Sequence, residues 1–137
     1  MTETLTETDI SDLERFSFGD SPELANTLLA LVLAGVKTGT CWAARDGQLT
    51  EIGQRMVACD GGGQPRAVIE TVTLHQRVFS DVDAEFATKE GEGDRSLDYW
   101  REAHQAYFTR NGGFDPDMLV WCEEFRLVAT VEPADAA

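Results

Sequence analysis

The segment SPELANTLLALVLAGVKTGTC, residues 21–41, contains the signals of a helix, a turn and the start of a strand. Ser21 offers an N-cap hydroxyl, Pro22 suits the first helical position, and an acid follows in the first turn. Leucines and valines then recur at helical spacing, and Gly35 is typical of the left-handed residue that ends a helix. Residues 38–43 have the composition of a short strand. The segment therefore predicts a helix from Ser21 to Gly35 that leads into a strand.

Lys37 lies in the turn between this helix and this strand, and it is one of only two lysines in a chain with nine arginines. A cation just after a helix C-terminus is favoured by the helix dipole, which is a purely structural use. Lysine, unlike arginine, can also lose its proton when it is desolvated, so Lys37 could act as a base beside the hydroxyl of Thr40. Thr38 is a competing hydroxyl on the same strand face. Both interpretations stay open from these residues alone.

The rest of the chain continues the alternation of helices and strands. The run Asp60-Gly-Gly-Gly-Gln64 predicts a hairpin turn; no helix and no Lys-Ser/Thr follow it, as a phosphate-binding loop requires. Further elements are expected as a short helix over 9–15, hairpin strands over 54–59 and 65–74, helices over 80–89, capped by Ser80, and 96–109, and a strand over 118–128. This order favours an α+β domain around an antiparallel sheet or a small open barrel.

The 137 residues fit a single domain, with no repeats and no proline-rich linker. Residues 1–8 are expected to form a disordered acidic arm, residues 9–131 the domain, and residues 132–137 a flexible tail. The longest apolar run, residues 28–34, is far shorter than the roughly 20 residues of a membrane span. The acidic N-terminus is the opposite of a signal peptide, so a cytoplasmic protein is expected.

Charge and cysteine content narrow the function classes. A formal net charge of −14 argues against strong binding to long nucleic acids, because such binding needs many phosphate contacts from Lys and Arg. A small pocket for one nucleoside or a short single strand remains compatible with it. The three cysteines are isolated and have no histidine at ligand spacing, so neither a disulfide framework nor a metal site is expected.

Three other stretches offer candidate site residues, each beside a structural alternative. KEGEGD, residues 89–94, is either a solvated turn before a capped helix or a flexible segment that brings an acid into a pocket. Glu123 falls on an apolar strand face, where it either marks a sheet margin, pairs with an arginine or serves a site. Trp42 and Arg45 could stack on and pair with a base, or be a core tryptophan and a surface arginine.

Four segments together resemble the bacterial single-domain branch of the ASCH domain family, within the PUA-like superfamily. They are FGDSPELANTLLALVLAGVKTGTC, GQPRAVIETV, FATKEGEGDRSLDYWREAHQAYF and VWCEEFRLV, so the resemblance runs from Phe18 to Val128. The most specific parts are the G-x-K-x-x-T motif and EGEGDRSLDYW. The resemblance implies a small open β-barrel of mostly antiparallel strands with flanking helices, and a cleft suited to RNA or a nucleoside.

The resemblance also implies a chemistry. Some members of the family remove the acyl group from N4-acetylcytidine, using the lysine and threonine of the motif and a distant glutamate, without metal or cofactor. These positions fall here on Lys37, Thr40 and Glu90, with Glu92 a close alternative to Glu90. Lys37, with a pKa lowered by the pocket, would take the proton of Thr40, and Glu90 would orient Lys37 or pass the proton to the leaving amine.

Other members of the family are reported as ribonucleases or RNA-binding modules, so a module that binds RNA or a nucleotide is the alternative function. The chain departs from the compact amidohydrolases by its segment RSLDYWREAHQAYF. The substrate-binding residues expected for either function are Trp42, Arg45, Glu92, Arg95, Ser96 and Tyr99. The expected partner is a modified nucleoside or a short RNA.

Overall fold

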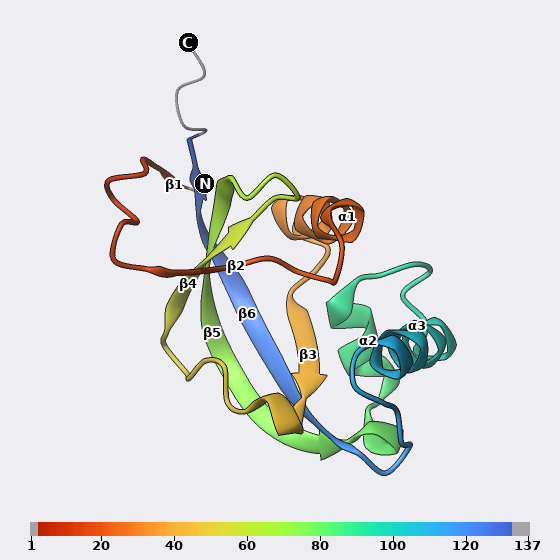
Figure 1. Cartoon of the computed structure of the whole chain (residues 1–137). Coiled ribbons are helices and arrows are strands. Elements are labelled where there is room, and N and C mark those ends of the chain that lie inside the picture. Colours follow the sequence, from red (N-terminus) through yellow and green to blue (C-terminus); the bar gives the residue numbers. More distant parts are fainter. Residues whose placement is uncertain (1–2, 133–137) are drawn as a thin grey trace.

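A computed structural model describes residues 3–132 and shows a curled sheet flanked by helices (Figure 1). The strands are β1 (Glu3–Leu5), β2 (Glu14–Phe16), β3 (Gly39–Ala43), β4 (Arg55–Cys59), β5 (Pro65–Val78) and β6 (Leu119–Val131). The helices are α1 (Pro22–Leu33), α2 (Ala84–Glu90) and α3 (Leu97–Arg110), with single 3-10 turns η1 (Ala44–Asp46) and η2 (Phe79–Asp81). Among the described residues, no helix is long and apolar enough to cross a membrane.

The sheet is built around the two long strands β5 and β6, which pair antiparallel. β4 pairs with the other edge of β5, while β3 and β1 share the free edge of β6. β1 pairs in parallel with β6 and β2 in parallel with β4, and the remaining pairs are antiparallel. Register shifts after Val68 and after Thr71 bend the long strands, as β-bulges do. The predicted α+β fold, a small open barrel of mostly antiparallel strands, is confirmed.

The segment from Ser21 onward folds as predicted. The Ser21 hydroxyl accepts a hydrogen bond from the N–H of Leu24, and Gly35 follows the helix with a φ of 78°. One face of α1 is buried through Ala25, Leu28, Leu29 and Val32. The chain then turns through Lys37 into β3, so this turn is held between a buried helix and a paired strand.

The structure corrects two of the predicted helices. Where a helix over 9–15 was expected, residues 9–13 form turns that lead into β2, because Glu14–Phe16 pairs with β4. The helix expected to be capped by Ser80 begins at Ala84, where the Asp83 side chain accepts from the N–H of Phe86.

The expected disordered arm over residues 1–8 is also wrong for its described part. β1 pairs with Ala129–Val131 because β6 runs past the predicted end at 128 and offers a free edge there. The N–H of Glu132 donates to the carbonyl of Leu5 at 2.8 Å. The rest of the predicted tail, 133–137, lies outside the described residues.

Two hydrophobic clusters lie on either side of β3. One packs α1 against β4, β5 and β6 around Leu28 and Phe125. The other packs α2 and α3 against β3 and β6 around Phe86, Trp100 and Phe108. Figure 1 shows α1 on one side of β3 and the α2–α3 pair on the other. The turn before β3 therefore lies between these two clusters.

Gly91 ends α2 and turns the chain back toward this region. It has a φ of 73°, and a Cβ built there would lie 2.7 Å from the carbonyl oxygen of Val36. The backbone of α2 is fixed beside it, because the N–H of Thr38 donates to the carbonyl of Lys89 at 2.7 Å. Gly91 thus permits the close approach that places the residues on both sides of it, Glu90 and Glu92, next to Lys37.

Replacing Gly91 with alanine is expected to lower the free energy of unfolding by more than the roughly 1–2 kcal/mol that a left-handed alanine costs. The added cost comes from the contact with Val36. Gly35→Ala is the matched control, because Gly35 has a φ of 78° and a Cβ at that position would meet no other atom within 4 Å. Urea denaturation of both variants measures the difference. Equal losses would show that the contact with Val36 relaxes freely.

Candidate functional site

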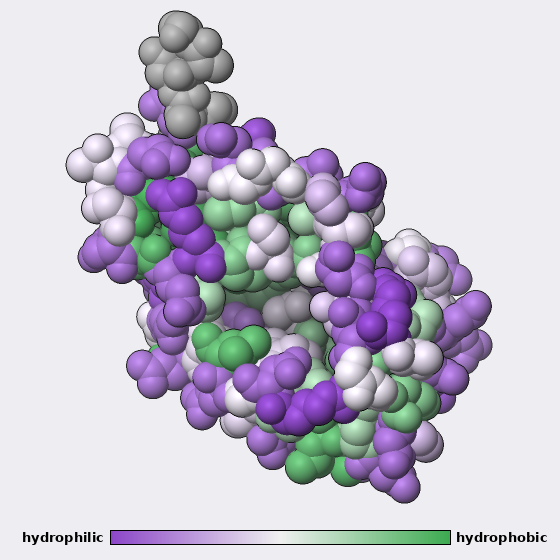
Figure 2. All heavy atoms as spheres, in the orientation of Figure 1, coloured by the Kyte–Doolittle hydropathy of each residue, from purple (hydrophilic) through white to green (hydrophobic). Residues whose placement is uncertain are grey.

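Two adjoining clefts open on the face of the molecule between α1, β3 and α3. Their volumes are about 290 and 250 Å³, and they share the lining residues Phe18, Gly19, Thr40, Cys41 and Tyr107. Figure 2 shows a hollow on this face, with apolar residues within it and hydrophilic residues at its rim. Together the clefts are in the size range of roughly 300–1,000 Å³ that holds small ligands. We call the larger one, which contains Lys37, the lysine cleft, and the other one, which contains Glu123, the Glu123 cleft.

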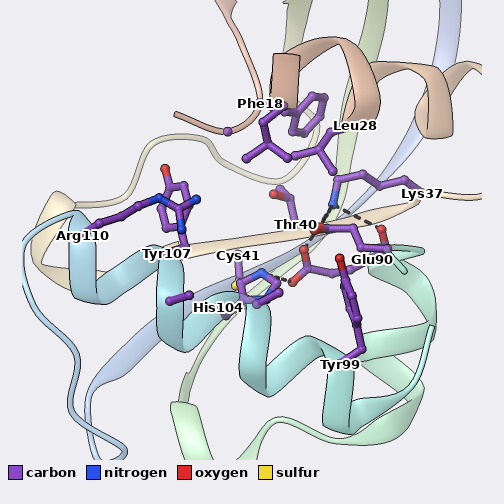
Figure 3. Close-up of a pocket in the computed structure, with 15 residues that line it drawn as sticks. Phe18, Leu28, Lys37, Thr40, Cys41, Glu90, Tyr99, His104, Tyr107 and Arg110 are labelled. Carbon is purple, nitrogen blue, oxygen red and sulfur yellow. Dashed lines mark hydrogen bonds and ion pairs between the residues drawn. The ribbon is translucent and has the colours of Figure 1, made fainter. Parts of the chain in front are cut away.

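Lys37 lies at the wall of the lysine cleft and is buried, with 2% of its surface exposed. Its ammonium group has three acceptors: the Glu90 carbonyl at 3.3 Å, Glu90 Oε1 at 3.2 Å and Glu92 Oε2 at 3.1 Å (Figure 3). An ammonium carries three protons, so these contacts use all of them. The ring of Phe18 lies above, 5.6 Å from Nζ. Lys37 is thus held by Glu90 and Glu92, the first two acids of the KEGEGD stretch.

Glu90 is even more deeply buried, with 1% exposed, and its second carboxylate oxygen is also occupied. Oε2 accepts from the indole N–H of Trp100 at 2.6 Å and lies 3.4 Å from Nε2 of His104. Burial alone would raise the pKa of Glu90, but His104, Lys37 and these hydrogen bonds hold the pKa well below its usual range. Glu90 is therefore an ionised, fixed carboxylate.

The same contacts correct the expected protonation of Lys37. Burial favours the neutral amine, but Glu90 and Glu92 outweigh it, so the pKa of Lys37 is raised instead of lowered. His104 behaves in the same way: burial lowers its pKa, and the Glu90 carboxylate more than compensates. Lys37 is therefore a charged ammonium in this arrangement, and it has no lone pair with which to take a proton.

Thr40 stands where the two clefts meet, because it lines both of them. Figure 3 shows its side chain and that of Lys37 pointing into the same space, below Phe18 and Leu28. Within residues 3–132, the Thr40 hydroxyl forms no hydrogen bond with another protein group, so it is free for a ligand. Thr38, the competing hydroxyl, is exposed and lines neither cleft. Of these two threonines, only Thr40 therefore lines the clefts.

The Glu123 cleft contains a second buried acid. Glu123 is 6% exposed and lies directly opposite Thr40 in the β3–β6 register. Its Oε2 accepts from the Thr71 hydroxyl at 2.7 Å, and Thr71 in turn lies 2.9 Å from the Thr50 hydroxyl. Burial raises the pKa of Glu123 to about 6, although Thr71 and Lys37 act against this. Apolar and aromatic side chains complete the wall, among them Phe16, Trp42, Leu49 and Met56.

The structure brings together most of the predicted site residues. Lys37, Thr40, Glu90, Glu92 and Tyr99 line the lysine cleft, and Trp42 lines the Glu123 cleft. Both Glu90 and Glu92 contact Lys37; the side chain of Glu90 is buried, and that of Glu92 is 17% exposed.

Three of the predicted substrate-binding residues line neither cleft. Arg45 donates to the carbonyls of Asn111 and Gly113 and so holds the loop after α3. Arg95 is exposed and has a φ of 67°. Ser96 caps α3 by accepting from the N–H of Tyr99. Arg45 and Ser96 line neither cleft because their side chains bond to backbone groups of the loop after α3 and of the first turn of α3.

The sequence interpretation missed Trp100 and His104, which contact Glu90 from α3. The two rings stack with centroids 4.3 Å apart, and His104 Nδ1 lies 2.8 Å from the Trp100 carbonyl. Their i, i+4 spacing on one helix face was the signal that could have paired them. Nothing in the sequence shows that this face meets Glu90, because the contact depends on how α2 and α3 pack.

One group of side chains has the donor types of a metal site. Ligand atoms of Cys41, Glu90 and His104 lie within 4.8 Å of one another, and zinc uses such a set. However, both Glu90 oxygens already accept hydrogen bonds, and the Lys37 ammonium lies 3.2 Å from one of them. A cation would have to enter beside a fixed positive charge. Burial also raises the pKa of the Cys41 thiol well above its usual value, so the residues present do not fit a metal ion.

Glu123→Gln is expected to change how stability depends on pH. The folded protein keeps a proton on Glu123 up to about pH 6, whereas the unfolded chain loses it near 4.5. The free energy of unfolding of the wild type therefore falls as pH rises through this window, by up to about 2 kcal/mol. The variant should lose this fall, as measured by urea denaturation across the window. Glu124→Gln is the control, and equal profiles for wild type and Glu123→Gln would contradict the prediction.

Comparison with known proteins agrees with this architecture. The family model for the ASCH domain matches residues 14–129, so the chain belongs to the ASCH domain family. An ASCH domain from Lactobacillus crispatus JV V101 is 31% identical, with a TM-score of 0.79, over 85% of this chain and 79% of that one. A protein from Enterococcus faecalis V583 is 35% identical, with a TM-score of 0.77, over 85% of this chain and 77% of that one. The expected PUA-like fold is thereby confirmed.

A more distant solved structure shares the fold alone. The ASCH protein of Zymomonas mobilis is 11% identical, with a TM-score of 0.60, over 90% of this chain and 72% of that one. No match was found among the curated proteins.

Proposed function

We propose that this protein is an amidohydrolase that removes an acyl group from an N4-acylated cytidine or a related modified nucleoside, with Thr40 as the nucleophile. The observation that carries the proposal is the place of Thr40. Its unbonded hydroxyl lies at the junction of two clefts, beside a buried lysine that two glutamates hold. A hydroxyl nucleophile beside a fixed charge is the arrangement that acyl transfer requires.

In this proposal Lys37 acts as a positive charge and not as a base. An amide carbonyl attacked by Thr40 develops negative charge on its oxygen, and an ammonium in a largely buried site stabilises that charge. Glu92 is the more exposed of the two carboxylates on Lys37, so its hydrogen bond is the one that a substrate oxygen can replace. Glu90 keeps Lys37 charged and in place. Because it is ionised and fixed, Glu90 does not carry the proton to the leaving amine.

Two adjoining clefts suit a substrate that has an acyl group on one side of the scissile bond and a flat ring on the other. Aromatic side chains from different elements line the space, namely Phe16, Phe18, Trp42, Tyr99 and Tyr107. Aromatic faces of this kind stack on nucleobases. The acyl group can then lie toward Lys37 and the base toward Trp42, with the amide at Thr40.

The charges of the described residues weigh against the alternative of a binder of long RNA. Most arginine side chains are paired with acids, among them Arg110 with Asp20 and both Arg55 and Arg126 with Glu70. Because most of these cations are already paired and the net charge is −14, few positive side chains are left to neutralise the phosphates of an RNA. A single nucleoside has no phosphate, so its binding does not need unpaired cations.

The test is a chromatographic assay of the purified protein with N4-acetylcytidine. Release of cytidine and acetate in equal amounts is the expected result. A parallel sample with short single-stranded RNA, titrated with salt, tests the alternative. Binding that weakens steeply with salt, together with no release of acetate, would overturn the proposal in favour of an RNA-binding module.

A further inference from the structure

The proposed reaction needs a group that takes the proton of Thr40, and neither Lys37 nor Glu90 can do so. Lys37 is charged, with its three protons donated to Glu90 and Glu92. Both carboxylate oxygens of Glu90 already accept hydrogen bonds, from Lys37 and Trp100. The Glu123 cleft, which Thr40 also lines, offers another titratable group for this role.

That titratable group is Glu123. Glu123 and Thr40 are directly opposite in the antiparallel β3–β6 pair, and both side chains line the Glu123 cleft. Opposite residues in such a pair have Cβ atoms about 4.5–5.5 Å apart. A glutamate is long enough to reach the threonine hydroxyl from there, either directly or through one water molecule.

The hydrogen bonds around Glu123 leave one oxygen for this task. Thr71 donates its single hydroxyl proton to Oε2, so Thr50 must donate its own to Thr71. The chain of hydroxyls thus runs toward Glu123 and fixes the orientation of its carboxylate. Oε1 forms no hydrogen bond within the described residues, and it is not among their buried, unpaired polar atoms. It is therefore open to the cleft.

The backbone supports this orientation. The bulge after Thr71 in β5 shifts the register against β6 at Phe125 and Glu124, next to Glu123. Bulges commonly redirect side chains beside functional sites. No arginine or lysine forms an ion pair with Glu123 among the described residues, whereas the neighbouring Glu124 is paired with Lys89 at 2.9 Å. Glu123 is thus a buried acid without a structural counter-ion.

From this geometry we propose that Glu123 is the group that takes the proton of Thr40 and returns it to the leaving nitrogen, an inference that rests on the proposed amidohydrolase function. Thr40 Oγ bonds to the acyl carbon while its proton passes to the Glu123 carboxylate. The C–N bond then breaks, and the proton moves from Glu123 to the nitrogen of the amine. Water attacks the resulting ester and gives a proton to Glu123, which passes it back to Thr40 Oγ as the carboxylic acid leaves.

The environment of Glu123 suits a group that both takes and gives a proton. Its pKa of about 6 is near neutral pH, where acid–base catalysts are most effective. Of the charged and titratable groups, Lys37 before β3 acts on Glu123, and Cys41 on β3, Asp46 on η1 and Tyr107 on α3 line the same cleft. Environments that separate the pKa values of two acids in this way, here Glu90 and Glu123, commonly separate their roles.

The test uses two acyl donors and the variant Glu123→Gln, which keeps the acceptor for Thr71. With p-nitrophenyl acetate, mass spectrometry follows acetylation of Thr40, a step that needs a base but no acid for the leaving group. With N4-acetylcytidine, chromatography follows the whole reaction. Both rates should fall by about 10²-fold or more in Glu123→Gln. In the wild type the reaction rate should rise with pH near 6, where Glu123 loses its proton, and this rise should disappear in the variant. Binding of cytidine, measured by calorimetry, should remain.

Glu124→Gln is the matched control, because it removes an adjacent carboxylate that points to Lys89. It should keep the wild-type rates. Acetylation of Thr40 that depends on Glu123, without hydrolysis of N4-acetylcytidine, would support the role of Glu123 and refute the proposed substrate. Hydrolysis at the wild-type rate by Glu123→Gln would leave the function standing and overturn this inference. Absence of acetylation of Thr40 by either donor would overturn both.

Discussion

Lys37→Met is expected to lower the free energy of unfolding by about 3–5 kcal/mol, the cost of leaving a buried charge without its partner. Lys37 and Glu90 are 2% and 1% exposed, so water cannot replace the lost ammonium. Methionine has a similar length and leaves little empty volume, so the loss of stability can be assigned to the missing charge. Urea denaturation followed by tryptophan fluorescence measures it.

The second lysine of the chain provides the control. Lys89 also contacts two acids, Glu85 and Glu124, but its side chain is 34% exposed. Partly exposed ion pairs of this kind contribute about 0–1 kcal/mol, so Lys89→Met should cost little. The double variant Lys37→Met/Glu90→Gln should recover part of the loss, because it removes both buried charges. Equal losses for the two single lysine variants would contradict the contribution assigned to the buried pair.

Thr40→Val is expected to lower turnover of N4-acetylcytidine by about 10⁴-fold or more, because removal of a hydrolase nucleophile has effects of this size. Valine has the shape of threonine and suits a strand, so the fold should be unchanged. Thr40→Ser keeps the hydroxyl and should keep measurable turnover. Initial rates by chromatography, together with the thermal unfolding midpoint of each variant, separate loss of chemistry from loss of structure.

Thr38→Val is the control for this prediction. Thr38 lies two residues earlier but is exposed and lines neither cleft, so its variant should react at the wild-type rate. Wild-type turnover by Thr40→Val would show that another group attacks the amide. Loss of turnover in Thr38→Val alone would show that Thr38, and not Thr40, is the nucleophile.

Local signals predicted the elements that carry the site. Caps and apolar spacing predicted α1 and α3, and the motif around Lys37 predicted which lysine and threonine to examine, because both features act within a few residues. The two strands that the sequence did not predict, β1 and β2, depend on pairing with segments that are distant in the sequence. β1 exists because β6 extends far enough to offer an edge, and β2 replaces the predicted helix because β4 lies beside it.

The sequence by itself determined that this is an α+β ASCH domain with a lysine and a threonine where the helix that follows Ser21 leads into a strand, since that information is carried by short-range pattern. Only the tertiary structure decided how these residues are charged and which acids serve them. Glu90 and Glu92 lie more than fifty positions from Lys37 and raise its pKa, while Glu123 gains its own pKa from burial opposite Thr40. Protonation depends on the distances and the burial that folding creates, and no local segment contains that information.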